Sequence, residues 1–146
     1  MMNEQIILFI VMFFVGLLLN PMNILAYRLS DLYLSITLIY SALFMASNML
    51  WSHQIVHYLS MGHFNSRIFI LGISLSLLFI ILLRTQLFVN DENWLKRMIS
   101  HHSTALTTTK QLLSKKRDND NIFRLAKDII TTQEIEILTM KNFLSQ

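Results

Sequence analysis

The chain has 146 residues, of which 53% are apolar and only 14% are charged, a composition too apolar for a soluble domain of this length. The formal net charge is +3, but the one basic run, Lys115-Lys116-Arg117, abuts Asp118 and Asp120. We interpret this run as a solvated turn and expect no nucleic-acid partner. The absence of cysteine from the sequence excludes a disulfide framework, a thiolate metal site and a cysteine nucleophile.

Charged residues are distributed unevenly along the chain. Only five lie before residue 91, namely Glu4, Arg28, Asp31, Arg67 and Arg84. This asymmetry predicts a membrane domain over residues 1–90 and a water-facing domain over residues 91–146.

Three apolar runs precede residue 91, and each approaches the roughly 20 residues that a spanning helix needs. They predict membrane spans at about residues 5–25, 32–52 and 67–89. The first run follows Glu4, has no basic residue before it and lacks a small-residue cleavage site, which favours a retained span over a signal peptide. The second contains serine, threonine and asparagine, so we expect it to pack between the other two. In the third, Gly72, Ser74 and Ser76 are small enough for close helix approach.

Three spans would place the amino terminus and the carboxy-terminal region on opposite sides of the bilayer. Arg28, Arg84, Lys96 and Arg97 would then lie on the side of the carboxy-terminal region, against Arg67 alone on the other. By the positive-inside rule this count predicts a cytoplasmic carboxy-terminal region. The protein is expected to be an integral membrane protein in contact with lipid.

After residue 90 the apolar spacing becomes that of amphipathic helices. Asn90 or Asp91 can cap the first helix, and the cluster at residues 117–121 interrupts the pattern before a second helix. Two helices joined by so short a turn lie antiparallel. One hairpin cannot bury both sides of its apolar stripe, so we expect it to pair with a second copy or a membrane protein partner in a four-helix bundle.

Folding this hairpin about a point between Asp118 and Asn119 brings to one height residues whose numbers add to about 237. His102 then faces the neighbourhood of Glu136 and Gln133, and Met98 faces that of Met140. Imidazole and thioether are ligands that suit copper. His101 lies about 100° from His102, so the two cannot share one simple site, and one of them faces a neighbouring helix or subunit. The alternative interpretation is an interface histidine beside methionines that only fill the core.

A second constellation ends the second apolar run, where Met49, His53, His57 and Met61 recur every fourth residue, with His63 just beyond. This stripe is either an interfacial helix whose histidines reach water and headgroups, or a metal-acquiring surface. The sequence contains no Gly-rich phosphate loop, nucleophile elbow or His-Glu-x-x-His pattern, so we expect no enzymatic activity.

Two separated motifs, Trp94-Leu95-Lys96-Arg97-Met98-Ile99-Ser100-His101-His102 and a second over residues 129–140, resemble the domain of unknown function 305 family. The resemblance covers about residues 91–146 and implies a ferritin-like helical bundle that binds copper or another metal. Ser100 replaces the family's usual proline, and Thr104 and Thr108 stand where many relatives carry methionine. The matching ligand positions are Met98, His101, His102, Glu136 and Met140.

The first 90 residues also resemble three-span bacterial members, which implies a bacterial inner membrane. Relatives with soluble tails are often exported, which implies a periplasmic hairpin and conflicts with the count of basic residues. Two functions are therefore expected. The first is a membrane-anchored protein of copper or other transition-metal homeostasis, with the hairpin as the binding site. The alternative is a structural or accessory subunit of a larger membrane assembly, with the hairpin as its docking surface.

Overall fold

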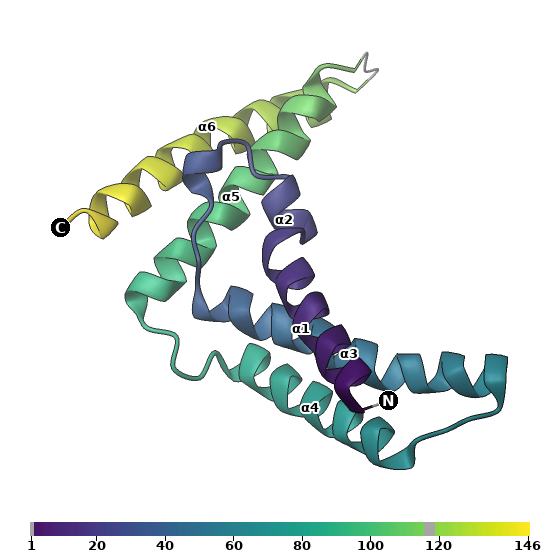
Figure 1. Cartoon of the computed structure of the whole chain (residues 1–146). Coiled ribbons are helices and arrows are strands. Elements are labelled where there is room, and N and C mark those ends of the chain that lie inside the picture. Colours follow the sequence, from purple (N-terminus) through teal and green to yellow (C-terminus); the bar gives the residue numbers. More distant parts are fainter. Residues whose placement is uncertain (1, 116–118) are drawn as a thin grey trace. The chain divides into compact units, whose positions relative to one another are not determined.

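The computed structural model describes residues 2–115 and 119–146 (Figure 1). Within these ranges every regular element is helical, which confirms the predicted all-α class. The chain divides into two compact units. The first comprises Met1–Asn20 and Ile36–Phe88, and the second comprises Pro21–Ser35 and Val89–Gln146. The second unit thus includes a segment that the hydropathy pattern places in the first domain.

The first unit contains three long helices, α1 (Met2–Leu18), α3 (Ile36–Met61) and α4 (Ser66–Thr85). Helix α3 packs against both α1 and α4. This arrangement confirms the prediction that the second apolar run lies between the other two.

Two stretches are long and apolar enough to cross a membrane, Asn3–Ile24 and Ser66–Thr85. Helix α3 does not meet that test, so the prediction of three such spans is corrected to two. It begins at Ile36, not at residue 32, and continues to Met61 for 26 residues. The physical reason is that polar side chains within the apolar run itself, among them Ser47, Asn48 and Ser52, lower its mean apolarity.

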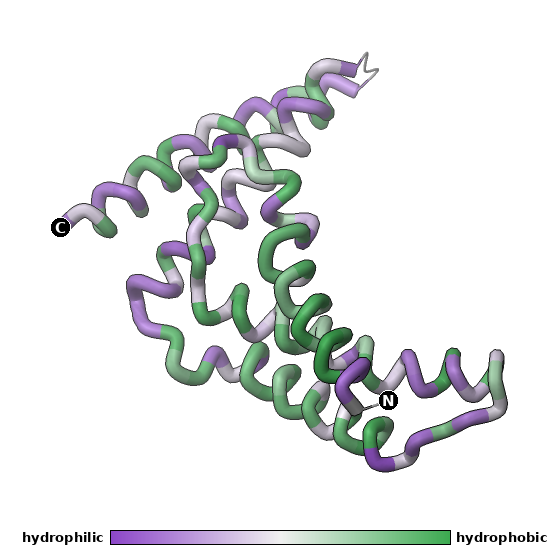
Figure 2. The backbone as a smooth tube through the Cα atoms, viewed as in Figure 1, coloured by the Kyte–Doolittle hydropathy of each residue, from purple (hydrophilic) through white to green (hydrophobic). Residues whose placement is uncertain are grey.

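The first unit buries mainly small and polar side chains, with Leu38 and Leu50 as the buried leucines of α3, and exposes many large apolar ones. Ala42, Ala46 and Ser47 of α3 are fully buried, whereas Ile7 of α1 and Ile70 of α4 are 60% and 62% exposed. Figure 2 shows α1 and α4 as mostly hydrophobic along their length. This distribution is the reverse of that of a water-soluble helical domain.

Close approach between α3 and α4 depends on Gly72. A Cβ atom there would lie 2.8 Å from the backbone nitrogen of Trp51, a distance that side chains do not tolerate. One turn later, the Ser76 hydroxyl donates to Asn48 Oδ1 at 2.9 Å. Gly72 and Ser76 are buried in α4, in agreement with the predicted close approach of a neighbouring helix. Ser74 is exposed and takes no part in the interface.

The second unit is built on a hairpin of α5 (Asp91–Leu113) and α6 (Asp120–Leu144). The two helices lie side by side and run in opposite directions, as predicted (Figure 1). Asn90 caps α5 by accepting from the Asn93 backbone amide at 3.0 Å. Residues 116–118 of the predicted turn lie outside the described part of the chain. The hairpin core contains Ile99, Leu106, Ile137 and Met140.

Segment Pro21–Ser35, which we call the connecting segment, contributes two short helices to the second unit. Helix α2 covers Pro21–Ile24, and the 3-10 helix η1 covers Leu29–Asp31. Both lie against α5. The hairpin is therefore covered on one side by chain from the amino-terminal half of the sequence.

Candidate functional site

His102 of α5 and Glu136 of α6 face each other in the hairpin. His102 Nδ1 lies 2.9 Å from Glu136 Oε2, which confirms the predicted pairing. His102 Nδ1 makes no hydrogen bond to this carboxylate, so the contact is defined by proximity. The His102 side chain is only 13% exposed, and that of Glu136 is 45% exposed. The pair therefore lies at the edge of the helix interface, reachable from solvent on the carboxylate side.

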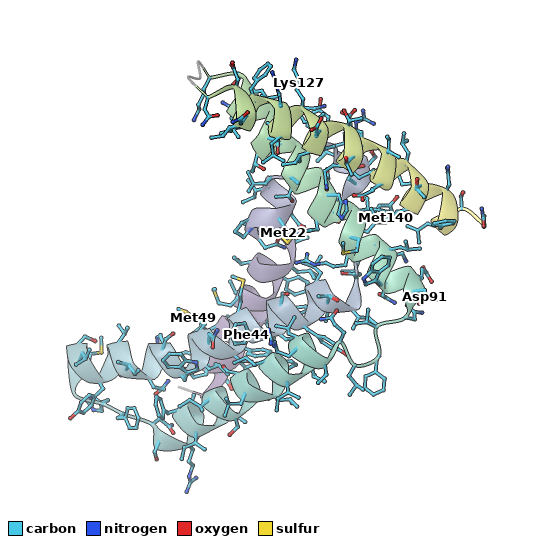
Figure 3. The ribbon with its side chains drawn as sticks, turned by 180° about the vertical axis from the view of Figure 1, so that it is seen from behind. Met22, Phe44, Met49, Asp91, Lys127 and Met140 are labelled. Carbon is cyan, nitrogen blue, oxygen red and sulfur yellow. The ribbon has the colours of Figure 1, made fainter. Side chains whose placement is uncertain are left out.

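The two predicted methionine ligands lie in or beside the hydrophobic core. Met140 is 7% exposed and belongs to the core cluster, and Met98 packs against that cluster. Figure 3 shows Met140 on the side of α6 that faces α5. This geometry associates Met98 and Met140 with the same hydrophobic cluster. It also gives their thioethers a packing role beside any metal chemistry.

His101 points away from the core and is exposed. Its ring centroid lies 6.0 Å from that of His102, with the ring planes at 70°. Partial burial lowers the pKa of His101, and the charges of His102 and Arg97 lower it further. A lower pKa keeps more of this imidazole neutral, the form in which histidine binds metals. The side chains of His101 and His102 therefore point to different faces of α5, as their spacing predicted.

Asp31 anchors the connecting segment to the hairpin, a role that the sequence interpretation missed. Its carboxylate is 1% exposed, accepts from Ser103 Oγ at 2.6 Å and lies 2.5 Å from Lys141 Nζ. Ser100 Oγ donates to the Asp31 backbone carbonyl at 2.8 Å. Ser100 thus makes a contact that a proline at this position could not make. The available signal was a lone acidic residue in an apolar region, since a buried charge requires a partner.

A second contact lies on the same side of the hairpin, at Tyr27. Its backbone amide donates to Ser103 Oγ at 2.8 Å, and Lys110 Nζ lies 4.0 Å from its ring centroid. Lys110 also donates to Glu134 at 2.7 Å. The hydrogen bond to Glu134 is the main reason why the pKa of Lys110 is raised. The connecting segment is therefore held to α5 by both polar and cation–π contacts.

The side of the hairpin opposite the connecting segment is uncovered within the second unit. His101, which is exposed, lies about 100° around α5 from Ser100, which contacts that segment. We call this side the open face. Residues recur on it in alternating steps of three and four, the spacing of a helix-packing seam. They are Trp94, Met98, His101, Ala105, Thr108 and Leu112 of α5, with Ile122, Leu125, Ile129, Thr132, Glu136, Thr139 and Phe143 of α6.

Several open-face side chains are apolar and well exposed. Trp94, Leu125 and Phe143 are 52%, 60% and 57% exposed. His101 and Glu136 lie on the same face among them. The open face therefore combines an apolar seam with the potential metal donors of the hairpin.

The second predicted constellation lies in the first unit, on α3. The ring centroids of His53 and His57 are 5.8 Å apart, and both rings line one cavity. Met49 and Met61 do not line that cavity, and Met61 is 66% exposed. The histidines of this constellation are thus brought together, and its methionines are not brought to the cavity with them.

Within residues 2–115 and 119–146, no three histidine, aspartate or glutamate side chains are grouped as a metal site. The hairpin brings together one imidazole and one carboxylate, His102 and Glu136. A second imidazole, that of His101, is close by on the open face.

Comparison with known proteins places this hairpin in a family. The family described as Domain of unknown function (DUF305) matches residues 83–144, which include all of α5 and α6. Uncharacterized protein L153 of Acanthamoeba polyphaga mimivirus is 32% identical over 146 residues, which are 100% of this chain and 95% of the relative. No solved structure matches the chain. The chain therefore belongs to the DUF305 family.

Proposed function

We propose that this protein is an integral membrane protein that binds copper or another transition metal through its hairpin. The observation that carries the proposal is the His102–Glu136 contact of 2.9 Å beside an open face that also presents His101. Imidazole and carboxylate are metal donors, and the thioethers of Met98 and Met140 add softer ones that suit Cu(I).

The membrane part of the proposal is supported by the first unit. Its exposed surface carries large aliphatic residues, and its buried positions carry serine, alanine and glycine. This pattern suits lipid, where close packing of small residues replaces the hydrophobic effect between helices. We propose that α3 crosses the bilayer as a third span, because its buried Ser47 and the bonded Asn48 lie toward neighbouring helices.

A second copy would complete the metal site. Tetrahedral metal sites in proteins use three or four protein ligands, more than one His102–Glu136 pair supplies. Pairing two open faces would form a four-helix bundle and bring His101 and Glu136 of both copies to one interface. The seam spacing of three and four residues supports this packing.

The metal proposal is tested with the full-length protein in detergent, without a polyhistidine tag. Cu(I) affinity is measured by competition with a colorimetric chelator. The His101→Ala/His102→Ala variant and Glu136→Gln are expected to bind at least about tenfold more weakly than the wild type. Gln111→Ala, at an exposed position of α5, serves as the control and should bind normally. Equal stoichiometry and affinity in all four proteins would remove the proposal.

Pairing through the open face has a matched test. Leu125 on the open face and Leu138 outside it are both 60% exposed. Leu125→Glu should reduce the oligomeric mass in detergent, because it buries a charge in the seam, whereas Leu138→Glu should leave the mass unchanged. The same mass for both variants would contradict pairing through this face.

The apolar open face also supports the alternative function, an accessory subunit that docks another membrane protein. Trp94 and Phe143 would be its anchors, since exposed aromatic residues dominate protein interfaces. A stable partner that co-purifies through a chelator wash, and through the His101→Ala/His102→Ala substitution, would favour this alternative. Loss of this partner on chelation would instead favour an assembly that depends on bound metal.

A further inference from the structure

A cavity of about 670 Å³ lies in the first unit, independent of the hairpin. It is lined by the start of α1, the second half of α3, the turn after α3 and the start of α4. Three of the five histidines of the chain line it, His53, His57 and His63. This concentration of imidazoles is the feature that the hairpin proposal leaves unused.

The turn after α3 brings the third histidine back to the helix. Gly62 adopts a φ of +70°, a left-handed conformation that glycine enters without strain. The chain thereby reverses, and the ring centroid of His63 lies 6.2 Å from that of His57. The ring centroid of His57 also lies 5.8 Å from that of His53, so His57 neighbours both other rings.

The 5.8 Å separation of His53 and His57 falls within the range for imidazoles that share a metal ion, and the 6.2 Å separation of His57 and His63 lies just above it. With metal–nitrogen distances of about 2 Å, two bound rings have centroids roughly 5 to 6 Å apart. Within the described residues the three rings do not surround one point, so binding requires ring rotation. His63 is exposed and His57 is half-buried, which leaves both rings room to rotate.

The neighbours of the rings favour a metal-binding tautomer. His57 Nδ1 lies 3.3 Å from the His63 carbonyl oxygen, and His63 Nδ1 lies 2.9 Å from the Met61 carbonyl oxygen. A ring nitrogen that faces a carbonyl oxygen carries the hydrogen, so Nε2 of each ring holds the lone pair. Metal-bound histidines use the same arrangement, with the other ring N–H donated to a backbone carbonyl.

Gln5 of α1 positions the third ring. Its side-chain Nε2 lies 3.3 Å from His53 Nδ1, and its Oε1 is buried without a hydrogen-bond partner. A 180° turn of the amide lets the oxygen accept from His53 Nδ1–H, since amide nitrogen and oxygen exchange places. All three histidines can then present Nε2 to a ligand.

We propose that His53, His57 and His63 bind one divalent transition-metal ion in this cavity. Neutral imidazoles suit Zn²⁺, Ni²⁺ and Cu²⁺, and Cu²⁺ binds most tightly in the general order of affinities. Glu4 and Arg67 also line the cavity, so their formal charges balance and favour neither an anion nor a cation. The choice of ligand is therefore determined by coordination to the three imidazole rings. The site differs from the predicted constellation in using His63 in place of Met49 and Met61.

The test uses a protein in which the hairpin site is removed, so that failure of either proposal is seen separately. Full-length His101→Ala/His102→Ala without a tag is titrated with Cu²⁺ in detergent and examined by electron paramagnetic resonance. We expect one equivalent of Cu²⁺ with splitting from imidazole nitrogens. Adding His57→Ala should weaken binding at least about tenfold, whereas adding Met61→Ala should change nothing. Absence of nitrogen splitting, or equal binding with His57→Ala, would overturn the proposal.

A second measurement needs no substitution. Diethylpyrocarbonate modifies accessible imidazoles, and mass spectrometry locates the modified residues. Zn²⁺ should protect His53, His57 and His63 of the wild-type protein, because Nε2 would be occupied. Unchanged modification of all three at saturating Zn²⁺ would contradict the site even if His57→Ala fails to fold.

Discussion

The two units of this protein bury different types of side chain in their interiors. In the first unit, Ser47 and Ala42 are fully buried while Ile70 is 62% exposed. In the second, Ile99 is fully buried, and Asp31 is the one buried charged residue among those that the structure describes, with its carboxylate paired. This contrast is the one expected if, as proposed above, the first unit lies in lipid and the second in water. An apolar side chain gains from leaving water, but it gains nothing by leaving lipid.

The largest expected effect is in the first unit, at Gly72. In Gly72→Ala the new methyl group would meet the Trp51 backbone at 2.8 Å, and backbone cannot move aside as a side chain can. We expect a loss of about 3 kcal/mol, at the upper end for overpacking. Thermal unfolding in detergent measures it. Ser74→Ala, on the exposed side of α4, is the control and should unfold at the wild-type temperature.

Gly16→Ala sharpens this prediction. Its methyl group would lie 3.1 Å from Ala42 Cα, so the effect should have the same sign and a smaller size. If neither glycine variant is destabilised, close packing of small residues does not hold the first unit together, and the contrast with the second unit fails.

The next effect is in the second unit, at the buried carboxylate. Asp31→Asn leaves Lys141 without its partner, and we expect a loss of about 2 to 3 kcal/mol, below that of a fully buried pair because Lys141 is 25% exposed. Hydrogen exchange of the α5 amides measures the local stability. Asp31→Leu/Lys141→Met should recover most of the loss, since it removes both charges. Wild-type exchange in Asp31→Asn would mean that the connecting segment is held by other contacts.

The smallest effect concerns pH. The pKa of Lys110 is raised above its ordinary value of 10.5, mainly by the hydrogen bond to Glu134. The folded state therefore holds this proton more tightly than the unfolded state. The resulting stabilisation is present below pH 10.5 and is lost as the pH rises through the higher pKa of the folded state. For a pair near the surface it amounts to less than about 1 kcal/mol.

This loss is measured by urea titrations of wild type and Lys110→Met at pH 9 and pH 11.5. The difference in free energy of unfolding between the two proteins should be smaller at pH 11.5. Lys96, which pairs with Glu92 within α5, provides a reference variant, Lys96→Met. A pH-independent difference for Lys110→Met would assign its effect to packing of the lysine methylene chain, because the ion pair with Glu134 and the cation–π contact with Tyr27 both need the charged ammonium.

The hairpin was predictable because its determinants are local. Helix period, an asparagine cap and a short turn define two antiparallel helices, and their equal rise places His102 opposite Glu136. The outward position of His101 follows from the same geometry. The apolar runs of α1 and α4 were predictable for a similar reason, since apolarity accumulates along consecutive residues.

The remaining features depend on contacts between distant parts of the chain. Asp31 and Lys141 are 110 residues apart, and no local pattern links them. His63 is absent from the stripe of four-residue steps, and only the turn at Gly62 returns it to His57. For α3, local composition suggested a span that ends near residue 52, whereas the helix continues to Met61.

By itself, then, the sequence determined the helices, the antiparallel hairpin and the level at which His102 meets Glu136 and Gln133 of the second helix, because spacing along a helix converts directly into direction and height. Only the tertiary structure decided which side of the hairpin is covered, which cation pairs with Asp31 and which histidines share a cavity. Those outcomes depend on non-local packing and on the need of each buried polar group for a partner, which periodicity does not encode.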